Sequence, residues 1–192
     1  MTLIKYQEFL LHFPTSEQRI FHLGTITERY FYMSEDQVEE FQKELAAVFD
    51  PSRRFTKPAD RLYSFCFGFY SLIRVTLEAT YKLNQYFDKK YSNQELQQYR
   101  EDWFTRIDAI RQIANDIVKH PLDDETRKKD YFFEPGGSDS MGSVTIYKWW
   151  IDPQKEMDFS KEIKPAIDLQ TVFDYLEGLA EKYSAVLGAV VK

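Results

Sequence analysis

The clearest amphipathic pattern in the chain ends in the sequence Ile110-Arg111-Gln112-Ile113-Ala114-Asn115-Asp116-Ile117-Val118-Lys119-His120-Pro121. Apolar residues recur every three or four positions from Leu96 to Ile117, which predicts one face of a long α-helix. Ser92 and Glu95 have the spacing of a capping box and predict where this helix begins. Proline pushes the residue before it out of helical geometry, so we expect the helix to end at His120.

The rest of the helical pattern predicts a bundle around this helix. An apolar stripe from Ala59 to Lys89 predicts a second long helix, which is also apolar on its other faces and is therefore expected to be central. A short turn joins the two helices, so they should lie antiparallel. Shorter apolar stripes predict further helices at Leu3–Phe13, Ile20–Tyr30, Val38–Val48 and, after Asp168, Val172–Leu187. A capping-box spacing between Ser34 and Gln37 separates the second of these stripes from the third.

The segment before the last predicted helix has a different pattern. Tyr131–Phe133 and Ser143–Trp150 are aromatic and β-branched, and the turn-rich sequence Glu134–Gly142 lies between them. This pattern predicts a β-hairpin over about 131–150, followed by a polar connector from Asp152 to Pro165. We therefore predict a mainly all-α fold, an antiparallel bundle of five or six helices with one inserted β-hairpin, in which residues 1–192 form a single domain.

Composition narrows the classes of function. The chain has 192 residues, 43% of them hydrophobic, and a net charge of −6. An acidic chain disfavours a broad nucleic-acid-binding face and double-stranded DNA as a partner, but it leaves room for a small basic cleft. The single cysteine, Cys66, excludes an internal disulfide and a metal site built from cysteines. We see neither a signal peptide in Met1–Phe13 nor an apolar run that could span a membrane, so we expect a cytoplasmic protein that does not bind membranes.

Polar residues at informative spacing occur near the end of the long helix. At about 100° per residue, Arg111 and Asn115 fall at one margin of its apolar face, and Asp116 and His120 fall at the opposite margin. Asn115 and His120 therefore point about 140° apart on a regular helix. One interpretation is that His120 is only a C-terminal cation, favoured by the helix dipole and by Asp116.

A second interpretation comes from a resemblance. The segment from Asn115 to His120 resembles the signature of the HEPN superfamily, helical domains that are often RNases of defence and toxin–antitoxin systems. Asn115 stands where the family has arginine, Asp116 where it has a polar residue, and His120 where it has histidine. The resemblance implies a homodimer in which the motifs of two subunits face each other across a cleft, with RNA or a cognate protein as partner.

The resemblance also implies roles for single residues. His120 would be the general acid or base acting on a ribose 2′-hydroxyl, without a metal or a cofactor. Arg111, Asn115 or Lys119 would hold the phosphate, with Asp116 as a further substrate contact. Asparagine cannot supply the cation of the family's arginine, although Arg111, one turn earlier, or Lys119, which points away from the core, could substitute for it. Whether the protein is an enzyme, namely a metal-independent endoribonuclease, or an RNA-binding relative therefore stays open.

The residues also leave other classes of function open. A non-catalytic helical module that binds a protein partner would be favoured by an exposed apolar patch at Trp149 and Trp150 or on the last helix. Arg74, Glu78 and Lys82 lie four residues apart, which predicts a row of ion pairs on one helix face. A third hypothesis is a small-molecule enzyme that uses Arg74 and Glu78 inside the bundle.

Overall fold

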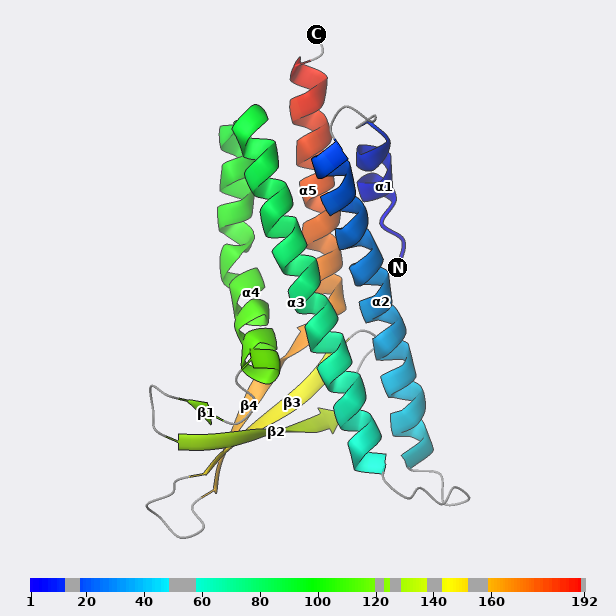
Figure 1. Cartoon of the computed structure of the whole chain (residues 1–192), viewed down its shortest axis with the longest axis vertical. Helices are drawn as coiled ribbons and strands as arrows, with labels where there is room; N and C mark the ends of the chain where they lie inside the picture. The colour runs from blue at the N-terminus through cyan, green and yellow to red at the C-terminus, as the bar shows by residue number, and fades with distance from the viewer. Residues whose placement is uncertain are drawn as a thin grey trace. The chain divides into compact units, whose positions relative to one another are not determined.

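The computed structural model describes residues 1–12, 18–48, 58–119, 123–124, 129–137, 143–151 and 159–190 (Figure 1). The described helices are α1 (Ile4–Leu11), α2 (Gln18–Val48), α3 (Pro58–Lys90), α4 (Gln94–Lys119) and α5 (Leu169–Val190). The described strands are β1 (Asp123–Asp124), β2 (Lys129–Gly137), β3 (Ser143–Ile151) and β4 (Phe159–Asp168). The prediction of a mainly helical protein is confirmed.

One long helix, α2, replaces the two helices that the sequence predicted on either side of Ser34. The predicted capping box at Ser34 and Gln37 is wrong, because α2 continues through both residues. Ser34 is fully buried and lies on the same side of the helix as the buried residues Phe31, Val38 and Phe41. A helix break at Ser34 would interrupt this buried stripe, so packing outweighs the local capping signal.

The boundaries of α3 and α4 agree with the sequence pattern to within two residues. α4 begins one residue after Asn93, whose side-chain oxygen accepts a hydrogen bond from the backbone N–H of Leu96 at 3.1 Å. The N-cap is therefore Asn93 and not the predicted Ser92. α4 ends at Lys119, two residues before the proline that was expected to stop it near His120.

The strands form one antiparallel sheet in the order β1-β2-β3-β4. β2 and β3 pair where the hairpin was predicted, with Tyr131 opposite Trp150. The predicted two-stranded hairpin is nevertheless too small, because β4 lies in the supposed polar connector and pairs with β3, with Ile163 opposite Tyr147. A hairpin alone is only marginally stable, and added strands supply the missing backbone partners.

Contacts between residues divide the chain into two compact units. The first unit contains Met1–Met33, Leu72–Arg111 and Gln170–Lys192, and the second contains Ser34–Ser71 and Gln112–Leu169. The prediction of a single domain over 1–192 stays a prediction. In the second unit, Val38 and Phe41 of α2 and Phe69 and Tyr70 of α3 are buried.

Aromatic side chains fill the core of the first unit. The ring of Phe87 on α3 lies 4.1 Å from that of Tyr183 on α5, and Phe9 of α1 packs against both at 6.4 and 5.0 Å between ring centres. Figure 1 shows the short helix α1 beside α2 and α5. Gly24 lets α1 approach α2, because a Cβ there would collide with the side chain of Leu10. These contacts explain where part of the chain's 16 Phe and 13 Tyr residues are used.

Candidate functional site

Arg111, the cation proposed to hold a phosphate, is already paired within its own helix. Its Nε donates a hydrogen bond to Oδ1 of Asp108 at 2.9 Å, and its Nη2 forms an ion pair with the same oxygen. Half of the Arg111 side chain is exposed, whereas Asp108 is mostly covered. A phosphate could reach this guanidinium only by sharing it with Asp108 or by displacing that carboxylate.

Asn115 lies one turn after Arg111 on the same side of α4. It is half-buried, beside the fully buried Ala114. Asp116 and Lys119 belong to the last turns of α4, but their side chains lie outside the described residues, as does the whole of His120. Arg111 and Asn115 are thus residues of α4 with described side chains, and a shared site of the five predicted residues stays a prediction.

The ion pairs predicted along α3 are present only in part. Arg74 donates to Glu78 at 2.9 Å, and the Glu78 side chain is half exposed. Among the described side chains no carboxylate lies within ion-pair distance of Lys82. Only Glu78 of this pair is half exposed, because Arg74 is mostly covered and its Nε is buried without a hydrogen-bond partner among the described residues. The small-molecule hypothesis for Arg74 and Glu78 therefore stays a prediction.

A buried polar network between α3 and α5 has no counterpart in the sequence prediction. The hydroxyl of Tyr183 donates to Oδ1 of Asn84, whose Nδ2 donates to the hydroxyl of Tyr175 at 3.4 Å. Burial raises the pKa of both Tyr175 and Tyr183, so both hydroxyls are neutral near pH 7. A network of neutral donors and acceptors fixes the register of two helices but supplies no general base.

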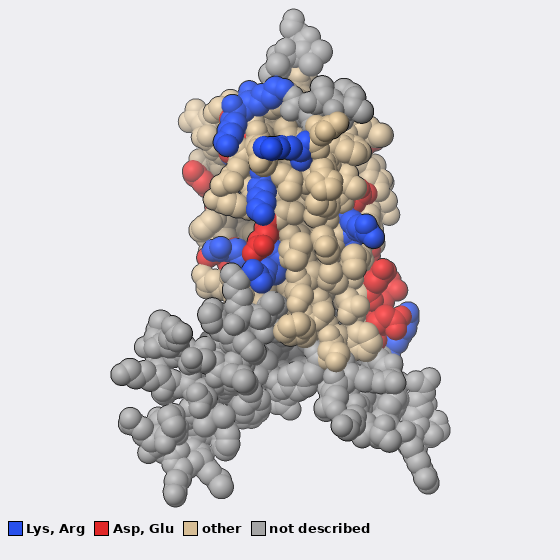
Figure 2. Space-filling view, in the orientation of Figure 1, with Lys and Arg blue, Asp and Glu red and all other residues tan. Residues whose placement is uncertain are grey.

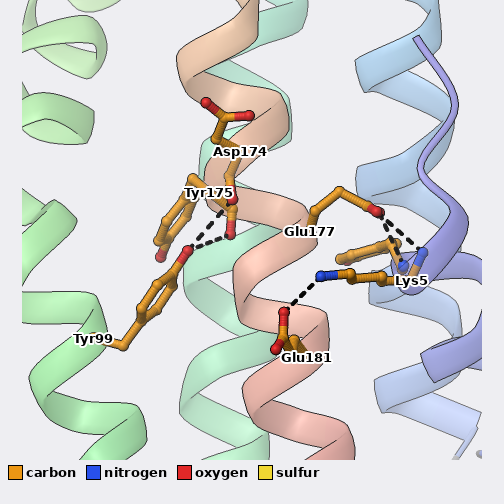
Figure 3. Close-up of polar contacts among 7 residues, drawn as sticks. Lys5, Tyr99, Asp174, Tyr175, Glu177 and Glu181 are labelled. Atoms are coloured by element: carbon orange, nitrogen blue, oxygen red, sulfur yellow. Dashed lines mark hydrogen bonds and ion pairs between the residues drawn. The ribbon is translucent and has the colours of Figure 1, made fainter.

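A second polar contact ties the start of α4 to the end of α3. Arg100 donates from Nη2 to both carboxylate oxygens of Asp88 at 2.8 Å, and only 14% of its side chain is exposed. The neighbouring residue, Tyr99, donates to the backbone carbonyls of Asp174 and Tyr175 on α5, both at 3.4 Å (Figure 3). These contacts align α3, α4 and α5 and leave Arg100 largely covered.

Glu177 of α5 caps the N-terminus of α1 from another element (Figure 3). Its carboxylate accepts hydrogen bonds from the backbone N–H groups of Lys5 at 3.1 Å and Tyr6 at 3.0 Å. The N-cap residue of α1, Leu3, has no side chain that could do this. Beside this contact, Lys5 forms an exposed ion pair with Glu181 at 2.6 Å, which lowers the pKa of that carboxyl.

The described residues contain no group of three or more His, Cys, Asp or Glu side chains that could hold a metal ion. No described helix is long and apolar enough to cross a membrane.

The chain was compared with family models, curated protein sequences and solved structures. No family model, curated protein sequence or solved structure matches the chain.

Proposed function

We propose that this chain is a HEPN-like protein that binds RNA, and cleaves it without a metal, in a cleft between two copies of the chain. One observation carries the proposal: α4 runs without interruption to Lys119, directly before His120-Pro121. Asn115 to Lys119, the described part of the segment, are the last residues of a long helix that follows another long helix, and this arrangement supports the proposal.

The chemistry follows from the side chains of this segment. His120 takes the proton of a ribose 2′-hydroxyl or protonates the leaving oxygen, since its ordinary pKa lies near neutral pH. Arg111, Asn115 and Lys119 bind the phosphate, with Asp116 beside them. Arg111 donates to the phosphate while it keeps part of its ion pair with Asp108, because its exposed N–H groups can bind the phosphate and the carboxylate together.

The test is cleavage of a mixed RNA pool by purified protein in EDTA. We expect wild-type protein to cleave, His120→Ala to lose cleavage, and Arg111→Gln to bind RNA more weakly. Arg106→Gln is the matched control, because it removes an exposed cation from the same helix. The Arg106 guanidinium lies over the ring of Trp103. No cleavage and no RNA binding by the wild type would refute the proposal; binding without cleavage would retain only the non-catalytic form.

A second candidate is a protein-interaction module. It is favoured by exposed apolar side chains in the first unit, where Ile4 and Leu11 lie seven residues apart on α1 and are 58% and 81% exposed. Phe104 on α4 is 63% exposed. Capture of a defined partner that is lost in an Ile4→Ser/Leu11→Ser variant, together with inactivity towards RNA, would favour this candidate.

A further inference from the structure

Cations from two helices gather around one tyrosine at the end of α3. The guanidinium carbon of Arg19 on α2 and the ammonium nitrogen of Lys89 on α3 each lie 5.5 Å from the centre of the Tyr86 ring. Arg19 also donates to the Tyr86 hydroxyl at 3.1 Å. Lys82 lies one turn before Tyr86, so its spacing places it on the same side of α3. We call Arg19, Lys82, Tyr86 and Lys89 the basic end of α3.

The basic end differs from the rest of this acidic chain. Arg19, Lys82 and Lys89 are exposed, and among the described residues none has a carboxylate within ion-pair distance. The nearest acidic residue along α3, Asp88, is neutralised by Arg100. Figure 2 shows Lys and Arg atoms gathered over this end of α2 and α3, where few Asp or Glu atoms appear.

Lys89, in the last turn of α3, also has a simpler role, because cations stabilise the C-terminus of a helix. That role does not account for Arg19, which comes from the first turns of α2, where a cation is unfavourable. It also does not account for Lys82, two turns before the helix ends. Two cations held against one tyrosine, with a third placed one turn away by helical spacing and no acidic partner for any of them among the described residues, therefore point to an anionic ligand.

An exposed aromatic side chain narrows the class of that ligand. Tyr81 precedes Lys82 and is 63% exposed, and it shares a face of α3 with Gln85 and Lys89 by helical spacing. Exposed aromatic rings beside cations bind single-stranded nucleic acid, because bases stack on the ring while the cations follow the phosphates. An acidic peptide would use the cations but would gain little from the ring.

We propose that the basic end of α3, with Tyr81, binds single-stranded RNA outside the motif of α4. The inference rests on the proposed function: the RNA that binds the motif of α4 would also contact the basic end of α3. α4 begins beside the end of α3, and Arg111 lies 17 residues after Gln94, about 26 Å along the helix. RNA that is long enough to cover this distance is bound more tightly than a short oligonucleotide.

The test measures binding of labelled oligouridylate by fluorescence anisotropy at several salt concentrations. In the variant Arg19→Gln/Lys82→Gln/Lys89→Gln we expect the Kd for long RNA to rise at least about tenfold. The slope of log K against log salt should fall by about 2, since each lost phosphate contact on a single strand contributes about 0.7. Tyr81→Ala should weaken binding about tenfold, whereas Tyr81→Phe should not.

The control variant Arg29→Gln/Lys43→Gln/Arg106→Gln removes the same number of exposed charges elsewhere on the helices. It should change the Kd less than about threefold, as expected for charges that contact no phosphate. Lys82→Gln/Lys89→Gln keeps the bond from Arg19 to Tyr86, and a loss of binding in this variant with an unchanged Tm excludes a folding defect.

Each other result overturns the inference in a distinguishable way. If wild-type protein binds RNA and the basic-end variant binds like the control, the basic end is not a contact region, while the proposed function stands. If wild-type protein binds no RNA, both fail. If it binds poly-glutamate through these cations but not RNA, the surface serves an acidic protein instead.

Discussion

Replacement of Glu177 by alanine should loosen the N-terminal turn of α1 on α5 without disturbing the rest of the bundle. Glu177 accepts hydrogen bonds from the N–H groups at the second and third positions of α1, the positions that an N-cap side chain normally serves. Because Leu3 supplies no cap, both N–H groups lose the only side-chain acceptor that they have among the described residues. Loss of a cap costs about 1–2 kcal/mol, and for a chain of this size that lowers the Tm by about 2–8 °C.

Glu181→Ala is the matched control, because it removes the neighbouring carboxylate on the same helix. The ion pair from Glu181 to Lys5 is exposed on both sides, so water already screens it and its loss should change the Tm less. Glu177→Gln keeps one acceptor oxygen and should fall between the wild type and Glu177→Ala.

The assay is thermal unfolding together with hydrogen exchange of the α1 amides. In Glu177→Ala we expect exchange of the Lys5 and Tyr6 amides to accelerate, while the amides of α3 keep their protection. Equal effects of Glu177→Ala and Glu181→Ala on the Tm, or unchanged exchange at Lys5 and Tyr6, would refute the capping role.

Three further predictions concern the same bundle. Gly178→Ala should lower the free energy of unfolding by about 1–3 kcal/mol, because a Cβ there would collide with the hydroxyl of Tyr99. Gly188→Ala should raise it slightly, because a Cβ at that position has no described atom within 4 Å. Urea unfolding of both variants measures these changes. Above pH 10 the protein should lose stability, because Tyr183 loses its proton at its ordinary pKa of 10.0 only when unfolded, and tyrosinate absorbance should appear together with unfolding rather than before it. Below pH 4.5 the ion pair of Glu181 with α1 should weaken, since the lowered pKa of this carboxyl stabilises the folded state above its ordinary value of 4.5. An NMR titration of the Glu181 carboxyl in the folded protein with its midpoint at or above 4.5 would contradict this.

The sequence predicted helices well where one apolar stripe controls the whole element. α3 and α4 have such stripes, and their boundaries were predicted to within two residues. It failed at Ser34, where a local capping signal competes with burial that depends on the packed structure. It also failed at β4, whose lysines and proline hide the strand until pairing with β3 is known.

At the candidate sites, too, contacts between neighbours on one helix could be predicted, whereas contacts between different helices could not. The pair of Arg111 with Asp108 could have been predicted, because residues three apart on a helix are neighbours. The network of Asn84 with Tyr183 joins residues 99 positions apart, and no spacing rule connects them. The basic end of α3 likewise depends on Arg19 reaching Tyr86 from another helix.

The contact between α1 and α5 also has a consequence for synthesis of the chain. Lys5 and Glu181 are 176 positions apart, so at 5–20 residues per second the ribosome adds the second about 10–35 s after the first. During that interval the side of α1 that carries Tyr6, Phe9 and Leu10 has no α5 to cover it. Until α5 has been synthesised, α1 is therefore a temporarily uncovered apolar segment of the growing chain.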